Sequence, residues 1–494
     1  MSLAIINKFD GGQSEDVRTF AVNQHDSSSN FNVYTSPHLL VPYIDTITET
    51  VSSGTLTDFF FTDVDVISVS GATLFVALGE AGGGSTALRF WKKGSSSDIT
   101  SAWEGGGTGL VSKVSGSLVV YKGLAYALGS NGTQHSLQRY DGNVTVTNIG
   151  TLTGFGNPPA KSFVHPEDNK LYMGSANVIS TYDGTTFVAT ALTLPDDKVI
   201  VSLTNYGSYL VIACRPRYGY GNSICYLWGR DTTLNTLQAV IDLGFGQVNI
   251  AENLNNTLFF VMSKSAIGNY SNILQNTLSV KGYAGGSVEV IKEINISSSF
   301  GTSLNVLKQK VNEHLYFGFS NDTALYRFGK NKSGEYFLSH DRAYPTGATI
   351  LAGFSLIGDF MWFCGTVSGT ANSFRRTRAL SESQEFTRVS TYVTTINPSM
   401  IIEDRYKFKQ LQSVQVAYTG GTLVSVQVSY DGGSYQTVLS SSSTGEQVLE
   451  ATAQNSDGAP LGEGREFQFR IESTGSAKVK EVRYFYKDIN TQMK

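Results

Sequence analysis

A short polar or glycine turn followed at once by a bulky apolar run recurs seven times along the middle of the chain. The equivalent apolar positions in the seven copies are Leu74, Leu124, Leu171, Leu210, Leu258, Leu315 and Met361. Successive copies are separated by 50, 47, 39, 48, 57 and 46 residues. One four-stranded blade of a β-propeller occupies roughly 40–50 residues. The spacing therefore predicts an all-β fold containing a propeller of about seven blades.

The apolar runs have the character that a propeller blade requires of its buried strands. Adjacent blades pack face to face about 10 Å apart, and large apolar side chains must fill that space. The alternative is one long β-sandwich or several sandwiches, because strands in such folds are also separated by turns every 8–12 residues. The spacing alone leaves both architectures open, and the blade-sized period favours the propeller.

The two ends of the chain differ from the middle. Residues 1–50 combine a polar tract with two prolines that favour extended backbone, which predicts an extended arm. The last ninety residues alternate strictly between apolar and polar positions, as in 411–418 and 423–430, which predicts half-buried antiparallel strands. The expected domains are therefore an arm over 1–50, a propeller over 51–400 and a small β-sandwich over 401–494.

Composition and charge narrow the classes of function. The chain carries 37 basic and 41 acidic residues, so its net charge of -4 argues against a surface that neutralises nucleic-acid phosphates. A locally basic lumen stays compatible with this balance. No apolar run approaches the roughly 18 residues that span a bilayer, and the start does not resemble a signal peptide. We therefore expect no membrane anchor.

The search for chemistry is negative. The six histidines show no zinc-ligand spacing, and Cys214, Cys225 and Cys364 form neither a metal motif nor a disulfide framework. Asp63 with Asp65, and Asp196 with Asp197, are the carboxylate pairs that a glycosidase or a calcium site would need. Adjacency in sequence does not provide the required cleft. We expect no catalytic residue, no metal site, no cofactor and no enzymatic activity.

Two segments are candidates for contacts with another subunit. One is the polar, aromatic and glycine-rich loop that contains Arg215, Arg217, Tyr218 and Tyr220. The other lies in the predicted arm and contains Tyr34, Pro37 and Tyr43. Loops on a rigid β-scaffold commonly carry interactions.

Both ends of the chain resemble structural proteins of tailed bacteriophages. At the start these residues are Phe9-Asp10-Gly11-Gly12 and Asn32-Val33-Tyr34-Thr35-Ser36-Pro37, which are similar to the amino-terminal arm of a group of such proteins. At the end, the hairpin Val428-Ser429-Tyr430-Asp431-Gly432-Gly433 and the run Glu466-Phe467-Gln468-Phe469-Arg470-Ile471 are similar to sandwich domains of tail and baseplate proteins. The resembling segments cover about 140 residues, and no family active site accompanies them.

This resemblance implies a structural component of a phage virion. It would lie in the tail as a nozzle, hub or tip protein, assembled in the host cytoplasm, and form subunit interfaces around the channel through which DNA leaves during genome ejection. The implied partners are other tail proteins and further copies of this chain in a ring, with six-fold symmetry as one option, and phage DNA would pass transiently. The alternatives are a tail protein that binds or cleaves host-surface glycan, and a cellular propeller scaffold for peptides.

Overall fold

In the computed structural model, all regular structure among the described residues is β-strand. The described residues are 2–6, 27–29, 31–32, 41–42, 47–48, 61–69, 72–80, 88–94, 103–105, 118–130, 133–142, 146–154, 161–217, 221–229, 236–264, 276–296, 306–311, 313–319, 324–330, 334, 336–343, 348–357, 360–367, 371–378, 391–396, 408–420, 423–431, 433–443, 445–452, 461–465, 467–474 and 477–489. A short helix suggested by the sequence near 379–386 lies outside them.

Seven four-stranded antiparallel sheets follow one another through the middle of the described chain. The first four sheets contain, in order, β6 (Phe61–Val69), β7 (Ala72–Glu80), β8 (Leu88–Gly94) and β9 (Glu104–Gly105); β10 (Leu118–Tyr121), β11 (Leu124–Ser130), β12 (His135–Tyr140) and β13 (Val146–Thr151); β14 (Lys161–Val164), β15 (Leu171–Ser175), β16 (Val178–Tyr182) and β17 (Phe187–Thr193); and β18 (Lys198–Tyr206), β19 (Tyr209–Pro216), β20 (Asn222–Trp228) and β21 (Leu237–Phe245).

The other three sheets continue the same order of strands. They contain β22 (Gln247–Leu254), β23 (Thr257–Lys264), β24 (Asn276–Tyr283) and β25 (Val288–Ile296); β26 (Val306–Val311), β27 (His314–Phe319), β28 (Ala324–Lys330) and β29 (Tyr336–Ala343); and β30 (Ala348–Ile357), β31 (Phe360–Val367), β32 (Ala371–Arg378) and β5 (Ile47–Thr48).

The turn that the sequence repeats is the hairpin between the first and second strands of a sheet. Tyr121 pairs with Leu124 across one such turn, and Leu254 pairs with Thr257 across another. In the first of these turns Lys122 and Gly123 both have positive φ, at 50° and 79°. Two consecutive positive φ values match the right-handed twist of the flanking strands. The apolar run is the second strand, which is buried throughout in β15.

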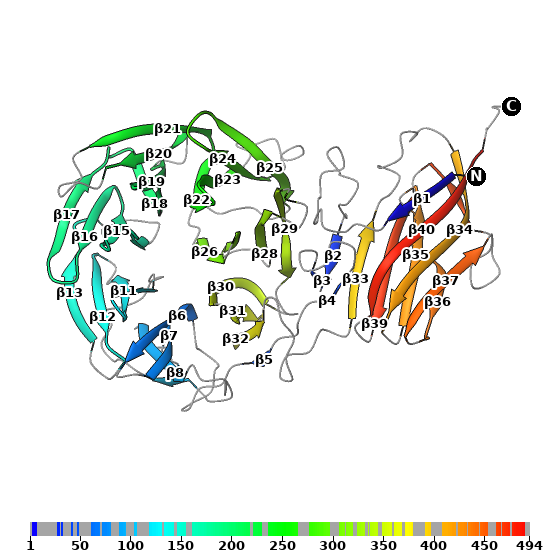
Figure 1. Cartoon of the computed structure of the whole chain (residues 1–494), viewed down its shortest axis with the longest axis horizontal. Helices are drawn as coiled ribbons and strands as arrows, with labels where there is room; N and C mark the ends of the chain where they lie inside the picture. Colours follow the sequence, from blue (N-terminus) through cyan, green and yellow to red (C-terminus); the bar gives the residue numbers. More distant parts are fainter. Residues whose placement is uncertain are drawn as a thin grey trace. The chain divides into compact units, whose positions relative to one another are not determined.

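The first strands of the seven sheets form a closed circuit. Successive first strands contact each other in the order β6, β10, β14, β18, β22, β26 and β30, and β30 contacts β6 again. Figure 1 shows these sheets arranged around a common centre. The architecture is therefore a seven-sheet β-propeller, which confirms the predicted fold class.

The ring is closed by a strand from the start of the chain. β5 precedes the first sheet in sequence, yet it pairs antiparallel with β32 and supplies the outermost strand of the seventh sheet. The pairing joins Ile47 to Arg376 and Thr48 to Arg375. The seventh sheet is thus completed by residues that precede the first sheet in the sequence.

The remaining strands build a β-sandwich. One sheet has the order β1 (Ser2–Ile6), β40 (Lys478–Ile489), β34 (Phe408–Thr419) and β37 (Glu446–Thr452), with β38 (Glu463–Gly464) also beside β34. The other has the order β2 (Ser27–Ser29), β33 (Thr391–Ile396), β39 (Phe467–Thr474), β35 (Leu423–Tyr430) and β36 (Gln436–Ser441). Two further short strands, β3 (Phe31–Asn32) and β4 (Val41–Pro42), pair with each other.

The predicted alternation places one face of each sandwich sheet in the core. Burial alternates strictly along β39, and Val414, Val426, Phe469 and Tyr484 belong to one apolar cluster drawn from both sheets. Alternate side chains of a strand point to opposite faces, so this pattern buries one face of each sheet against the other.

The domain boundaries differ from those predicted. Contacts divide the chain into one compact unit of 1–45, 326–343 and 378–494, and a second of 46–325 and 344–377. β29 belongs to the sixth sheet by its strand order and to the first unit by this division. The predicted arm contributes β1 and β2 to the sandwich and β5 to the propeller, and β33 joins the sandwich before residue 401. Pairings between strands distant in sequence leave no local pattern, so a division made along the sequence does not include them.

Removing a buried ring at the junction of the first and seventh sheets should destabilise the propeller alone. Trp362 is fully buried and packs edge-on against Phe75, with ring centroids 4.9 Å apart. We expect Trp362→Ala to lower the free energy of unfolding of the propeller by about 3–5 kcal/mol, because it loses apolar burial and leaves a cavity. Hydrogen exchange in increasing urea, read by mass spectrometry, measures this.

The matched control is Phe469→Ala in the sandwich core, where the side chain is equally buried. This variant should lower protection in the sandwich strands and leave the propeller strands unchanged. Equal loss of protection in both units for either variant would contradict two separate cores.

Candidate functional site

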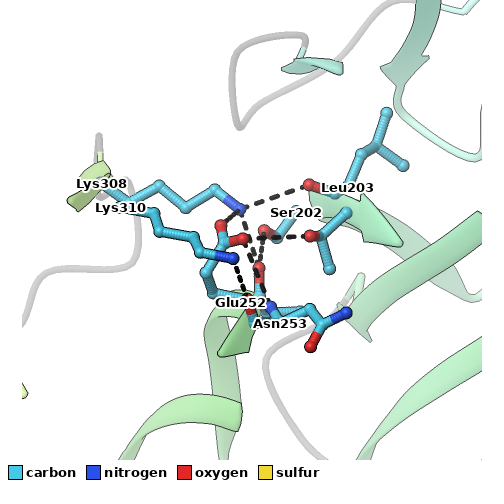
Figure 2. Close-up of polar contacts among 8 residues, drawn as sticks. Ser202, Leu203, Glu252, Asn253, Lys308 and Lys310 are labelled. Carbon is cyan, nitrogen blue, oxygen red and sulfur yellow. Dashed lines mark hydrogen bonds and ion pairs between the residues drawn. The ribbon is translucent and has the colours of Figure 1, made fainter. Parts of the chain in front are cut away.

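A polar cluster lies on the first strands of three consecutive sheets (Figure 2). Lys308 on β26 donates from Nζ to the backbone oxygens of Leu203 and Ala251, at 3.3 and 2.7 Å. The same ammonium group lies 2.8 Å from Oε2 of Glu252. An ammonium group has three N–H donors, so these three acceptors use all of them. One side chain therefore joins β18, β22 and β26.

The carboxylate of Glu252 is held from several sides. Its Oε1 accepts from the hydroxyl of Thr204 at 3.2 Å and from the backbone N–H of Asn253 at 3.3 Å. The side chains of Lys308 and Glu252 are 27% and 13% exposed, so the ion pair is largely shielded from water. Such a pair is costly to break, because either partner would be left as a poorly solvated charge.

Two neighbouring contacts extend the cluster. Ser202 donates from Oγ to the backbone oxygen of Ala251 at 3.2 Å, and Lys310 donates from Nζ to the backbone oxygen of Asn253 at 2.6 Å. Lys310 itself is exposed. These contacts link the three strands to each other. Among the contacts described for these residues, none brings a second carboxylate to Glu252. This arrangement suits mechanical cross-linking better than proton transfer.

A buried serine and histidine lie side by side in the second and third sheets. Nδ1 of His135 and Oγ of Ser175 are 2.6 Å apart, and Ser175 donates to the backbone oxygen of Gly154 at 2.7 Å. Since the hydroxyl hydrogen is directed to Gly154, the imidazole acts as donor to Ser175. A serine nucleophile needs the opposite arrangement, with histidine accepting its proton. The pair therefore has a structural geometry, and no sequence motif indicated it.

Three of the carboxylates singled out in the sequence, Asp65, Asp196 and Asp197, have partners of another kind among the described residues. Asp65 accepts a hydrogen bond from the backbone N–H of Val66 at 2.8 Å, and burial raises the pKa of this carboxyl group. Asp196 accepts from the side-chain amide of Asn177 at 3.0 Å, whereas Asp197 pairs with Lys198 at 2.7 Å. The side chain of Asp63 lies outside those described. Among the residues that the structure describes, no group of three His, Cys, Asp or Glu side chains could hold a metal ion.

The structure describes only part of the predicted contact loop. Arg215 on β19 is 7% exposed, and burial lowers the pKa of its guanidinium group. The side chain of Arg215 therefore presents little surface outside its own chain, and its role in a subunit contact stays a prediction. Arg217 is exposed, and its Nη2 donates to Oδ1 of Asn177 at 3.5 Å.

Five of the predicted contact residues lie outside the described part of the chain. They are Tyr218, Tyr220, Tyr34, Pro37 and Tyr43. Their role in subunit contacts stays a prediction. The thiols of Cys214 and Cys225, in contrast, are described, and both are free and buried.

Replacing Lys308 should weaken the propeller. We expect Lys308→Met to lower the free energy of unfolding by about 1.5–3 kcal/mol, because the charged carboxylate of Glu252 loses its partner. Urea denaturation followed by hydrogen exchange of the propeller strands measures this. The control is Lys310→Met, which removes one hydrogen bond from an exposed side chain and should cost less than about 1 kcal/mol. Equal effects of the two substitutions would contradict a special role for Lys308.

Acid should destabilise the propeller through His135. Burial lowers the pKa of this imidazole below its ordinary value of 6.5. The neutral form is thus favoured in the folded state, so the stabilisation is complete above pH 6.5 and is lost as the pH falls below that value. We expect the urea midpoint of the wild type to fall more steeply between pH 7.5 and about 5 than that of His135→Asn. Parallel pH profiles would show that His135 does not contribute.

Neither a protein-family model nor a curated protein matches the sequence. Among the described residues, no helix is long and apolar enough to cross a membrane.

Solved structures with similar folds include propellers from several sources. The WD40 domain of Toxoplasma gondii coronin is 9% identical and has a TM-score of 0.44, over 73% of this chain and 91% of that one. The WD40 propeller domain of Doa1 is 14% identical, with a TM-score of 0.41, over 69% of this chain and 98% of that one. The periplasmic gluconolactonase PpgL of Pseudomonas aeruginosa is 11% identical, with a TM-score of 0.41, over 67% and 99% of the two chains. The chain is similar to these propellers at low identity.

Proposed function

We propose that this protein is a non-enzymatic structural component of a tailed-phage virion. Its place is in the tail, as a nozzle, hub or tip protein that forms subunit interfaces around the channel through which DNA leaves. The assignment to a phage tail rests on the resemblance of both chain ends to tail structural proteins. The geometry supports a mechanical role, and one observation carries that part of the proposal: the circuit of seven first strands closes on itself.

A closed ring of sheets resists deformation because each sheet packs between two neighbours and few strand edges are free. The strand β5, which precedes the first sheet in the sequence, is hydrogen-bonded to the seventh sheet. Lys308 adds a polar link between three sheets. A wall or plug around a DNA channel needs such stiffness, and it does not need a reactive group.

The charge of the chain suits passage of DNA without capture. The formal net charge is -4, so copies of the chain around a channel would not bind phosphates strongly by their net charge. Strong neutralisation of the backbone would hold DNA in the tail and slow its exit. Contacts made by DNA in transit are expected to be weak and transient.

The proposal is tested on particles of the phage whose genome encodes this chain. We expect purified virions to contain the chain in several copies, detected by quantitative mass spectrometry, and antibodies against it to label the tail. An amber mutation in its gene should give particles that lack part of the tail or fail to eject DNA. Absence of the chain from purified particles would overturn the proposal.

The alternative function, binding or cleavage of host-surface glycan, is tested with the same phage and its host. Purified chain is incubated with host-surface polysaccharide, and binding and release of reducing ends are followed. Specific binding or cleavage by a chain that is present in virions would favour a receptor-binding or glycan-cleaving tail protein. No binding and no cleavage agree with the structural role.

A further inference from the structure

The first sheet of the sandwich has two different edges. Its strands have the order β1, β40, β34 and β37, and each strand pairs antiparallel with the next. Among the described residues, β37 pairs only with β34 and β1 pairs only with β40. Figure 1 shows β1 beside β40 in this unit. An unpaired strand edge exposes backbone N–H and C=O groups that can pair with another strand.

The β37 edge is acidic and carries an unusually exposed apolar side chain. Glu446, Val448, Glu450 and Thr452 alternate along the strand as its exposed residues. Val448 is 71% exposed, the largest value among the exposed large apolar side chains that are described. Glu446 is paired with Lys480 at one end of the strand. The strand contains two carboxylates and no basic residue, so its own charge is negative.

The β1 edge has a different composition. Its sequence, Ser-Leu-Ala-Ile-Ile, is uncharged and mostly apolar. Natural edge strands are commonly protected by charged residues or proline within the strand. β1 contains neither. An uncharged, mostly apolar strand brings no like charge to an edge that offers an exposed valine between carboxylates.

We infer that β37 of one copy pairs with β1 of the next copy, so that the sheet continues from one subunit into its neighbour. The directions agree with this. Because β1, β40, β34 and β37 alternate in direction, β37 and the β1 of a second copy in the same orientation run antiparallel. The added pair would extend the existing antiparallel ladder without reversing a strand.

This contact is head-to-tail, because it joins two different surfaces. Contacts of this kind generate a ring if the rotation between copies closes, and a filament if it does not. This pairing adds a subunit contact to the proposed function. That the resulting ring lies in a phage tail rests on the proposed function. A two-fold pairing of β37 with its own copy would instead bring four carboxylates together, and like charges on paired strands are destabilising.

The first test measures self-association of the full-length chain. We expect wild-type protein to form concentration-dependent oligomers in sedimentation velocity experiments. Val448→Lys should raise the dissociation constant by about tenfold or more, because it replaces an exposed apolar side chain of the edge strand with a charged one. The control is Val290→Lys on β25, where the valine is 57% exposed in the propeller. Association unchanged by Val448→Lys, or a wild type that stays monomeric, would overturn the inference.

The second test identifies the two edges. Val448→Cys and Ile5→Cys are made separately in a chain that carries Cys364→Ser, and the remaining cysteines, Cys214 and Cys225, are buried. We expect disulfide-linked dimers when the two variants are mixed and oxidised, and none from either variant alone. Dimers of Val448→Cys alone would show the two-fold pairing and overturn the head-to-tail contact. Circular dichroism of each variant confirms that it is folded.

These outcomes are independent of the virion experiment. A chain that is found in phage tails but does not pair through β37 and β1 would refute the inference alone. A chain that pairs in this way but is absent from particles would refute the proposed function alone.

Discussion

Closure of the ring is the constraint on which the propeller depends. In an open row of sheets the first and last would each expose an apolar face, and burial of such faces is the main favourable contribution to folding. Here the first strand of the seventh sheet contacts the first strand of the first sheet. The aromatic side chains of Phe75 and Trp362 pack together in the same apolar cluster. β5 then completes the seventh sheet with a segment from before the first sheet, so that the two ends of the ring are tied by backbone hydrogen bonds as well as by packing.

Polar groups on the first strands reinforce the same closure. Residues here cannot all be apolar, because the backbone oxygens of neighbouring first strands need donors when they are shielded from water. Lys308 supplies donors to two such oxygens and neutralises Glu252. The hydrogen bonds and the ion pair of this cluster hold neighbouring strands together. This is consistent with a mechanical role and gives no support to catalysis at this position.

The start of the chain serves both compact units. β1 and β2 lie in the sandwich and β5 lies in the propeller, although fewer than fifty residues contain all three. In the sandwich sheet that contains β1, β37 lies at the opposite end of the strand order, and the two strands differ in charge. The difference between β1 and β37 is what makes a directional contact between copies physically reasonable.

Local patterns were sufficient for much of the architecture. The period of turns and apolar runs predicted the number of sheets, because each copy is a hairpin whose second strand is buried. Strict alternation predicted the sandwich strands, because alternate side chains of a strand face opposite sides of a sheet. Neither pattern could reveal that Ile47 pairs with Arg376, or that Lys308 meets Glu252 at a distance of 56 residues in the chain. The sequence around Arg215 is polar and typical of a loop, so it did not predict that this side chain is buried. Periodicity reports how one strand is buried, whereas the choice of a distant partner follows from how the whole chain closes in space.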